Sequence, residues 1–534
     1  MQRQPSRPAR LDEAAARFAR FADRHRAPFA VALGVLAVVA VLPSAVWKPL
    51  WYDELFTFHV SRLTSIGAIR DALASGLDQQ PLPYFALHHS VFRMFGEGPL
   101  ATRLPELAGF ALMTGGVFAF VSHRAGAVCG ALAAVACWST EARQYATEAR
   151  PYALLAGFSA VSIACWQRST DGGRRGAWLA GLAVSLFGVV SSHWYGVLVV
   201  VPLAIGEGLR SLRRKKIDVA VWVAFGAAVL PIVFFLLPIL ASLTGLRASF
   251  WSRPTPAFAV EFYGWLLAPA AIPLAATLAG FGVWLAAGSP GRRTPRDGEA
   301  QIPVHEVGAA LALALLPCFG LALAVVFTNA LNERYVIPAV VGLAALFGFA
   351  ARTATTRPLV LVSWLVLVLG SFLARQVLVA RWVYQDRDRV SAVHIDAARA
   401  EPALPIVVQD PLVFLEYAKH APAPIVARLR YLADPAAQQA FTGFANVDPG
   451  LLVVRAHTDL PIEPAGDFLA SHERFYLLWT PGRFGWLLQK LSRDGVGLEV
   501  IEAGTDRVVV LVDRSQKPRE SGGGRTPPDR PEAR

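Results

Sequence analysis

Long apolar runs separated by short polar connections make up most of the first 375 residues. The first run, 30–46, is long enough to cross the hydrocarbon core of a bilayer, which takes roughly 17–25 residues of helix. Run length predicts about eleven transmembrane helices. Their expected ranges are 28–46, 105–121, 126–139, 151–167, 177–191, 195–208, 217–240, 262–287, 307–328, 335–350 and 358–374.

The first polar connection, 47–104, is too long for a plain connector, and loops of this length usually carry function. Its polar and apolar positions predict an amphipathic helix near 65–74. Aromatic and apolar residues over 84–95 predict a second helix lying at the membrane interface. We therefore expect this structured loop to be part of a transmembrane domain that covers 28–375.

Beyond about residue 375 the long apolar runs stop, and short apolar segments suited to buried strands follow. They predict a small α/β domain over 376–514. A helix is expected over 436–441, and the tail 515–534, rich in Pro, Gly and Arg, is expected to be disordered. The predicted strands are 405–409, 451–454, 475–479 and 507–512.

Composition supports an integral membrane protein. Hydrophobic residues make up 54% of the chain and charged residues 17%, whereas soluble domains carry about 25% charged residues. The net charge of +12 does not indicate a nucleic-acid partner, because the basic residues lie in short loops and form no stripe. The four cysteines lie in apolar spans, so they predict small core residues rather than a disulfide framework or a zinc site.

Basic residues gather in alternate connections, which predicts the topology. With about eleven spans threaded from a cytoplasmic N-terminal tail, 1–27, every basic connection falls on the cytoplasmic side. No small-residue cleavage site follows that tail, so it is not expected to be a cleaved signal peptide. The opposite side holds the loop 47–104, the segment 140–150 and the domain after 375. We therefore expect a multi-pass protein of the cell inner (cytoplasmic) membrane with an extracytoplasmic C-terminal domain.

Two adjacent carboxylates, Asp53 and Glu54, follow the first span at the membrane boundary. Ionised side chains are costly there unless they have a function. Acid–base chemistry, cation binding and proton coupling each fit such a pair. The alternative is that the two acids cap a helix at the membrane interface and have no catalytic or binding function.

A seven-residue repeat, Thr140–Ala146 and then Thr147–Ala153, supplies further charges. If both copies were helical, Glu141 and Glu148 would share one face. Pro151 suits the first turn of a helix, so a break near Arg150 and a new helix from Pro151 are expected instead. Guanidinium groups bind phosphate bidentately, which makes the arginines of the repeat candidate phosphate ligands; a salt-bridged loop is the alternative. These arginines are Arg143 and Arg150.

Polar and aromatic residues interrupt apolar stretches at two more places on the same predicted side. His193 and Tyr195 flank Trp194, where an interfacial aromatic belt explains the two aromatic residues but not the histidine. Arg334, within Asn332–Tyr335, fits either a snorkelling anchor or a phosphate ligand.

Together these residues resemble a known family, the bacterial polyprenyl-phosphate-dependent glycosyltransferases of the GT-C fold. The nearest group is the dolichyl-phosphate-mannose–protein mannosyltransferase-like family, which includes the lipid A aminoarabinose transferase and the rhizobial lipopolysaccharide core transferases. The resemblance covers about 28–375; each motif alone is weak, and their shared order makes the set specific. The motifs are Asp53-Glu54, Asp78–Tyr84, Ala101–Pro105, Thr147–Leu154 and Glu333–Tyr335.

The resemblance implies transfer of a sugar from a polyprenyl phosphate to a lipid, glycan or protein acceptor, with inversion, at the outer face of the membrane. Asp53 and Glu54 would be the catalytic residues, with Asp53 as the general base. Glu54 and Glu148 would orient the acceptor or hold a cation. Arg150 and Arg334 would neutralise the departing phosphate. No nucleotide or other cofactor is expected, and no metal ligands are assigned. Use of a divalent cation is left open.

Residues expected to contact substrate share these motifs or adjoin them. Gln80 stands where many relatives have His before Pro-Pro-Leu or Pro-Leu. If that His binds metal or acceptor in the relatives, its metal-binding role is not expected here, whereas Gln80 can still donate a hydrogen bond. The substrate-binding residues implied are Gln80, Arg143, Glu148, Arg150, Tyr152, His193, Tyr195, Arg334 and Tyr335.

Two other functions compete with this one. A secondary transporter or lipid-linked sugar flippase would use the outer acids for ion coupling, and a non-catalytic assembly or sensor protein would use none of them. Transporters place charges near the bilayer midplane on broken helices, often in two related halves. Here the charges lie at the boundary and no repeat relates two halves, which favours the transferase.

Overall fold

The structure is a computed structural model. It describes residues 7–171, 173–237, 240, 252–271, 275, 301–387, 401–443, 447–481, 485–504 and 507–515. The chain divides into two compact units, Met1–Arg387 and Asp388–Arg534.

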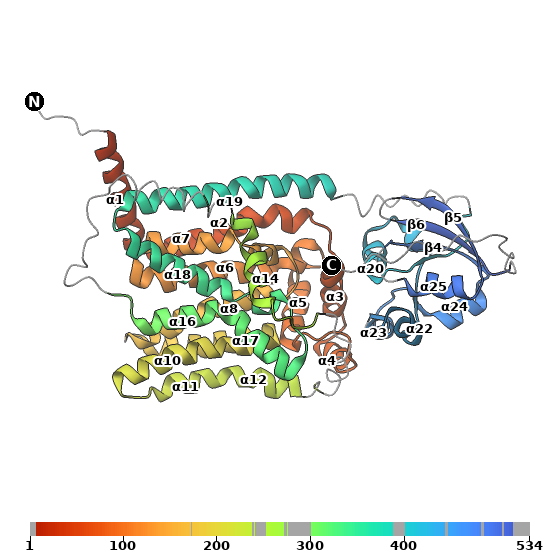
Figure 1. Cartoon of the computed structure of the whole chain (residues 1–534), viewed down its shortest axis with the longest axis horizontal. Helices are drawn as coiled ribbons and strands as arrows, with labels where there is room; N and C mark the ends of the chain where they lie inside the picture. The colour runs from red at the N-terminus through yellow and green to blue at the C-terminus, as the bar shows by residue number, and fades with distance from the viewer. Residues whose placement is uncertain are drawn as a thin grey trace, which may run out of the picture. The chain divides into compact units, whose positions relative to one another are not determined.

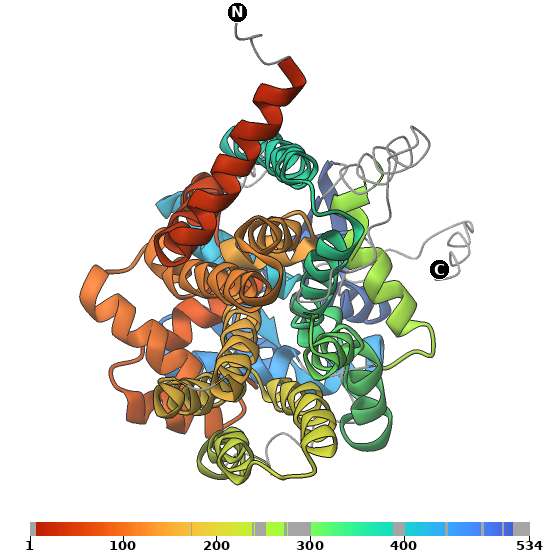
Figure 2. The same ribbon diagram turned by 90° about the vertical axis from the view of Figure 1, so that its left-hand side faces the viewer.

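The first unit is helical, and its long helices run roughly parallel in Figure 1 and are seen end-on in Figure 2. Its α-helices are α1 (Arg7–Arg24), α2 (Arg26–Trp47), α3 (Tyr52–Ser61), α4 (Ile66–Ala74), α5 (Leu82–Phe95), α6 (Pro99–Ala125), α7 (Ala127–Trp138), α8 (Tyr152–Thr170), α9 (Arg175–Ser192), α10 (Val200–Arg214), α11 (Val219–Phe225), α12 (Val229–Pro231), α14 (Phe258–Leu267), α16 (Val304–Ala314), α17 (Leu316–Leu323), α18 (Ala339–Ala354) and α19 (Pro358–Asp386). Short 3-10 or π segments join them: η1 (Glu141–Thr147), η2 (Trp194–Val199), η3 (Gly226–Ala228), η4 (Ile232–Leu236), η6 (Ala268–Ala270), η7 (Ala324–Thr328) and η8 (Glu333–Val336).

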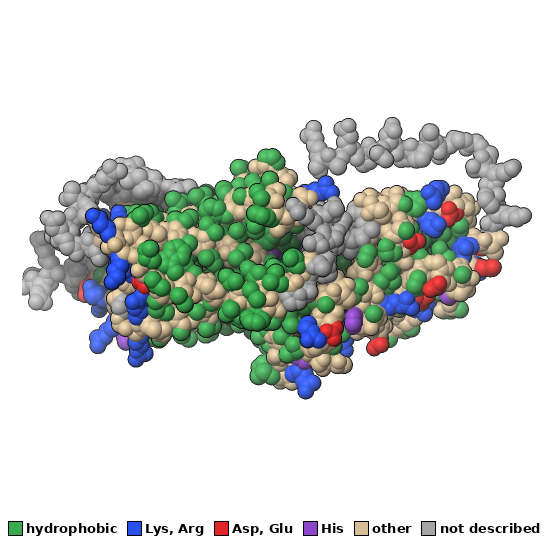
Figure 3. All heavy atoms as spheres, turned by 90° about the horizontal axis from the view of Figure 1, so that it is seen from below, with side chains coloured by type: hydrophobic (Ala, Val, Ile, Leu, Met, Phe, Trp, Pro, Cys, Tyr) green, Lys and Arg blue, Asp and Glu red, His purple; other side chains and the backbone are tan. Residues whose placement is uncertain are grey.

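Apolar side chains cover both the inside and the outside of this unit. On α2, Leu33 and Ala37 are buried, while Val31, Val35 and Val39 on another face are each more than half exposed. A helix that is apolar all round belongs in a hydrocarbon environment. Figure 3 shows the resulting apolar band between the two ends of the unit, with Lys and Arg gathered at the end that carries α1. The chain is therefore a multi-pass membrane protein.

The predicted spans coincide with helices. Each predicted range overlaps a helical segment, although 262–287 lies mostly outside the described residues. Six described helices are long and apolar enough to cross a membrane, or seven if the pair 304–314 and 316–328, bent by 52°, forms one broken span. Two shorter apolar helices, α7 and α18, accompany them. The count of eleven stays a prediction.

The loop 47–104 is folded into helices, as predicted. Ser65 caps α4, its Oγ accepting the Ala68 N–H at 3.1 Å, and α5 begins at Leu82 behind Pro81. The sequence did not predict α3, and α6 begins at Pro99, earlier than expected. These helices carry the loop's polar residues at one end of the bundle.

Glycines bring α6 and α8 into close contact. A Cβ atom at Gly109 would lie 2.5 Å from the backbone nitrogen of Leu154, and one at Gly116 would lie 2.5 Å from the carbonyl carbon of Ala160. Small residues at such crossings let two backbones approach within a membrane. This packing fixes the start of α8, next to the site described below, against α6.

The second unit contains a six-stranded mixed sheet with the order β3-β2-β1-β4-β6-β5. Strands β1 to β4 are parallel neighbours, whereas β6 runs antiparallel to β4 and β5 antiparallel to β6. The strands are β1 (Ile406–Val408), β2 (Leu429–Ala433), β3 (Ile462–Pro464), β4 (Arg474–Trp479), β5 (Gly497–Ala503) and β6 (Val508–Asp513). The helices are α20 (Pro411–His420), α21 (Ala423–Val426), α22 (Pro435–Thr442), α23 (Val447–His457), α24 (Ala465–Ser471) and α25 (Trp486–Arg493).

The small α/β fold was predicted, with one strand wrong. The segment 451–454 lies inside α23. Leu451 and Val454, three residues apart, face the core, and Pro449 lies in the first turn, where proline suits a helix. The sequence also missed β2, β3 and β5, and the predicted tail 515–534 lies outside the described residues beyond 515.

Candidate functional site

The two acids predicted as catalytic lie in the first turn of α3, directly beyond α2. Asp53 and Glu54 are the second and third residues of the helix, where its dipole favours negative charge. Adjacent residues on an α-helix point about 100° apart. The two carboxylates therefore reach different partners.

Glu54 is fully buried and paired with Arg103 of α6. Arg103 donates from Nε to Oε1 at 2.7 Å and from Nη2 to Oε2 at 2.6 Å, a bidentate geometry. Oε1 also accepts the Ala149 N–H at 2.8 Å, which ties the chain before α8 to α3. Because both oxygens are engaged away from solvent, the geometry favours a positioning role for Glu54 over the predicted catalytic or cation-binding role.

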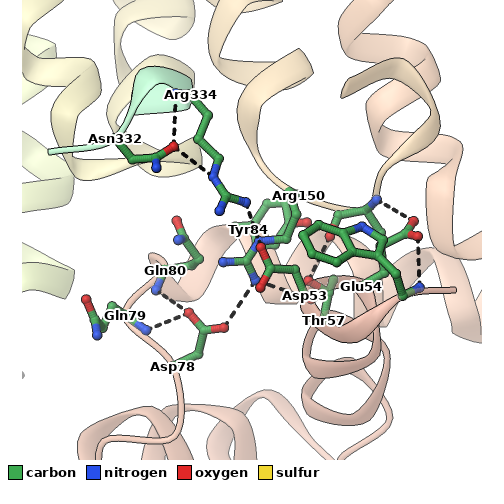
Figure 4. Close-up of polar contacts among 12 residues, drawn as sticks. Asp53, Glu54, Thr57, Asp78, Gln79, Gln80, Tyr84, Arg150, Asn332 and Arg334 are labelled. Carbon is green, nitrogen blue, oxygen red and sulfur yellow. Dashed lines mark hydrogen bonds and ion pairs between the residues drawn. The ribbon is translucent and has the colours of Figure 1, made fainter. Parts of the chain in front are cut away.

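Asp53 lies between two guanidinium groups from distant parts of the chain (Figure 4). Arg334 Nη1 donates to Asp53 Oδ2 at 2.7 Å, and Arg150 Nε lies 3.8 Å from the same oxygen. Asn332 Oδ1 accepts the Arg334 Nε at 3.0 Å and so fixes that side chain. The Asp53 side chain keeps 20% of its surface exposed, which leaves it open to a ligand.

Arg150 also faces Asp78, in the turn between α4 and α5. Its Nη1 lies 3.4 Å from Asp78 Oδ2. Asp78 Oδ1 accepts the backbone N–H groups of Gln79 at 2.6 Å and Gln80 at 2.9 Å, which holds the turn. Gln80 is buried, and its Oε1 has no hydrogen-bond partner among the described residues. An unpaired buried amide oxygen is costly, so Gln80 remains a candidate to contact substrate.

Glu148 lies where the repeat breaks. Its backbone is extended, and α8 begins at Tyr152 after Pro151, so the predicted break is confirmed and the two glutamates of the repeat do not share a helical face. Lys48, just beyond α2, donates to Glu148 Oε1 at 3.0 Å. Burial raises the pKa of Glu148, and the Lys48 charge opposes that rise. The pair adds no net charge beside Asp53.

The four predicted aromatic residues form one cluster beside Arg334. The His193 ring lies 4.5 Å from that of Tyr335, 5.7 Å from Tyr152 and 5.9 Å from Tyr195. The Arg334 guanidinium carbon lies 5.6 Å from the centroid of the Tyr152 ring, a cation–π contact. The structure thus brings together segments that lie far apart in the sequence.

His193 is a neutral member of this cluster. Burial, together with the positive charges of Arg150 and Arg334, lowers its pKa to about 3. Since an exposed histidine titrates near 6.5, an unfolded chain takes up this proton first as the pH falls. The contribution of His193 to stability is therefore present above about pH 6.5 and is lost as the pH falls towards 3.

We expect His193 to contribute no inflection to the pH dependence of activity between pH 5 and 8. A His193→Asn variant should keep the profile of the original protein, even if its rate is lower. The measurement is the initial rate of the proposed reaction across that range. An inflection near pH 6.5 that disappears in the variant would contradict a neutral, buried ring.

Arg143 is not brought to Asp53. It lies in η1, and its Nη1 donates to Gln376 Oε1 on α19 at 3.4 Å. Four residues at the site had no role in the sequence analysis. Asp78, Arg103 and Asn332 stood inside motifs or segments noted there, whereas Lys48 was marked only by its place after the first span.

The described residues include no group of three or more His, Cys, Asp or Glu side chains placed to hold a metal ion. The carboxylates of the site face Arg or Lys instead. We therefore derive no metal-assisted step from this geometry.

Comparison with solved structures identifies the fold. The chain is similar to ArnT from Cupriavidus metallidurans in the apo state, with a TM-score of 0.57 and 14% identity over 91% of this chain and 98% of that chain. It is similarly close to ArnT from the same organism bound to undecaprenyl phosphate, with a TM-score of 0.55, 14% identity and the same coverage. Neither a protein-family model nor a curated protein sequence matches the chain.

At this identity the likeness establishes the fold. The chain is a helical membrane protein of the GT-C type, as the sequence resemblance implied, and it carries the small C-terminal α/β unit that the pattern of apolar segments predicted.

Proposed function

We propose that this protein is a membrane glycosyltransferase that moves a sugar from a polyprenyl-phosphate donor to an acceptor at the outer face of the cytoplasmic membrane. The observation that carries the proposal is Asp53 held between Arg150 and Arg334. A base next to two fixed cations matches a reaction in which a hydroxyl or amine loses a proton and a phosphate leaves. The shared fold with ArnT, one structure of which holds undecaprenyl phosphate, supports the donor class.

In the proposed reaction the acceptor oxygen or nitrogen forms a bond to the anomeric carbon. The bond from that carbon to the phosphate oxygen breaks, and the oxygen keeps the electron pair. Both ion pairs of Asp53 use Oδ2, so we expect Oδ1 to take the acceptor proton. Attack opposite the leaving phosphate inverts the anomeric carbon.

Arg150 and Arg334 have a second task in this scheme, which is to stabilise the departing polyprenyl phosphate. Charge develops on that phosphate as the bond breaks, and fixed guanidinium groups lower the energy of the transition state. An incoming phosphate competes with Asp53 for Arg334. Binding of the donor therefore loosens the 2.7 Å ion pair and frees the base as the substrates assemble.

The expected orientation follows from charge. The last turns of α6, α10 and α18 are basic. We assign that end to the cytoplasm by the positive-inside rule, which puts Asp53 and the aromatic cluster on the outer side. An acceptor on that side belongs to the cell envelope, so the product is an envelope glycolipid, glycan or glycosylated protein.

A deletion strain tests the function. We expect mass spectrometry of its envelope to show an accumulated polyprenyl-phosphate sugar and an acceptor lacking one sugar, both restored by the intact gene. The Arg334→Gln variant should restore transfer at a rate about 100- to 1,000-fold lower, the usual cost of one transition-state donor.

The purified protein separates the transferase from a flippase. In detergent micelles there are no two membrane sides, so only a transferase converts the accumulated donor and the truncated acceptor into product. Release of polyprenyl phosphate in step with product supports the proposal. Recovery of both lipids unchanged, from protein that is folded by its thermal transition, would overturn it.

A further inference from the structure

A second cationic cluster lies outside the Asp53 site, where η1 meets α19. It consists of Arg143 from η1 and Arg375 and Gln376 from α19, and Arg143 Nη1 donates to Gln376 Oε1 at 3.4 Å. Burial, together with the nearby positive charge of Arg375, lowers the pKa of Arg143 to about 10. Glu141 offsets part of this charge. Two positive charges are thus held close together and partly shielded from solvent.

Each member of the cluster has a buried nitrogen without a hydrogen-bond partner among the described residues. These atoms are Arg143 Nε, Arg375 Nη1 and Gln376 Nε2. The Gln376 side chain belongs to a residue only 4% exposed. An unpaired buried donor is costly, and a charged one more so. Three N–H donors from two elements, with excess positive charge, fit the oxygens of one anion.

An apolar pocket of about 210 Å³ adjoins this cluster. Its walls come from α7, α14, η6, α18 and α19, with Cys137, Leu343 and Val368 among them. Thr140 also lines it, and the Thr140 carbonyl accepts the backbone N–H of Arg143 at 3.4 Å, so one turn of backbone joins the pocket wall to the residue that carries the guanidinium. An apolar cavity of about 150 Å³ already takes a benzene ring, so this pocket has room for part of a hydrocarbon chain.

The position of α19 in the membrane puts the cluster at the right depth for a headgroup. From Pro358 to Arg375 the helix rises about 26 Å, close to the roughly 30 Å of the hydrocarbon core. Val368, Phe372 and Gln376 follow at spacings of four on its buried face. The apolar pocket thus lies at the depth of lipid chains, and the three donors lie near the boundary.

We propose that Arg143, Arg375 and Gln376 bind the phosphate of an anionic lipid whose chain enters the adjoining pocket, at a site separate from Arg150 and Arg334. The shared chemistry is a lipid phosphate, and a substrate lipid and a phospholipid of the bilayer both supply it. If the bound lipid is a substrate, it is a reactant of the proposed transfer. Only this assignment as a substrate rests on the proposed function. The binding itself does not depend on it.

Native mass spectrometry of the full chain in detergent tests the site, with a short-chain polyprenyl phosphate and phosphatidylglycerol as separate probes. The Arg143→Gln/Arg375→Gln double variant should bind at least one probe 10-fold or more weakly. The matched control is Arg381→Gln, an exposed arginine on the same helix, which should bind as the original protein does. Loss of polyprenyl phosphate alone identifies a substrate lipid, and loss of phosphatidylglycerol alone identifies a bilayer lipid.

Unchanged binding of both probes to the folded double variant would overturn the proposal. If that variant does not fold, Ala344→Leu, which fills the pocket from α18, should weaken binding of the chain-bearing probes. Inorganic phosphate at equal concentration should not displace the lipids, because it cannot use the pocket. If inorganic phosphate, which has no hydrocarbon chain, bound as well as the lipid probes, that result would also overturn the proposal. None of these results depends on catalysis, so they stand apart from the test of the transferase.

Discussion

Replacement of Asp53 with Asn is expected to lower sugar transfer by about 100- to 10,000-fold, the usual contribution of a positioned general base. Asparagine has nearly the same shape, and its amide oxygen can still accept the hydrogen bond from Arg334. The helix α3 and the pairing of its neighbour Glu54 with Arg103 should persist. What is lost is the ability to take the proton of the acceptor. The measurement is the initial rate of polyprenyl-phosphate release at saturating donor, per mole of folded protein.

The control for Asp53 is an acid of the same loop that lies away from the site. Asp71 in α4 is exposed and pairs with its neighbour Arg70, so Asp71→Asn should transfer sugar at the original rate. Both variants should reach the membrane in equal amounts. Turnover near the original rate in Asp53→Asn would remove Asp53 as the base, whatever the fate of the other assignments.

Replacement of Glu54 with Gln is expected to destabilise the protein by about 3–5 kcal/mol. The reason is the full burial of both partners, which leaves the Arg103 charge without a counter-charge in a dry site. The new amide nitrogen would also face a guanidinium donor in place of one carboxylate oxygen. A lower thermal transition and a lower yield of detergent-purified protein measure the effect.

A double variant separates positioning from catalysis at Glu54. Glu54→Met with Arg103→Met removes both charges, so it should be more stable than Glu54→Gln, because no buried charge is left unpaired. Activity should return in part with the stability. A Glu54→Gln protein with the original thermal transition and no activity would instead make Glu54 a catalytic residue.

Several elements of the fold follow from local pattern. The run of α2, the Ser65 cap of α4 and the break before Tyr152 are set by hydrophobicity, capping and proline within a few residues. Such signals need no partner elsewhere in the chain. Where the sequence analysis was wrong or silent, the packing of a segment against the rest of its unit decided its secondary structure. The segment 451–454 is apolar enough for a strand, but its spacing buries one face of a helix.

The candidate site divides in the same way. The sequence by itself determined a multi-pass membrane protein whose acids, arginines and aromatic residues lie at the ends of apolar runs, because hydrocarbon excludes polar side chains from the runs themselves. Only the tertiary structure decided that Asp53 faces Arg150 and Arg334, whereas its neighbour Glu54 is sealed against Arg103. Adjacent residues on a helix point in different directions, and what each one meets depends on segments that folding brings from far along the chain.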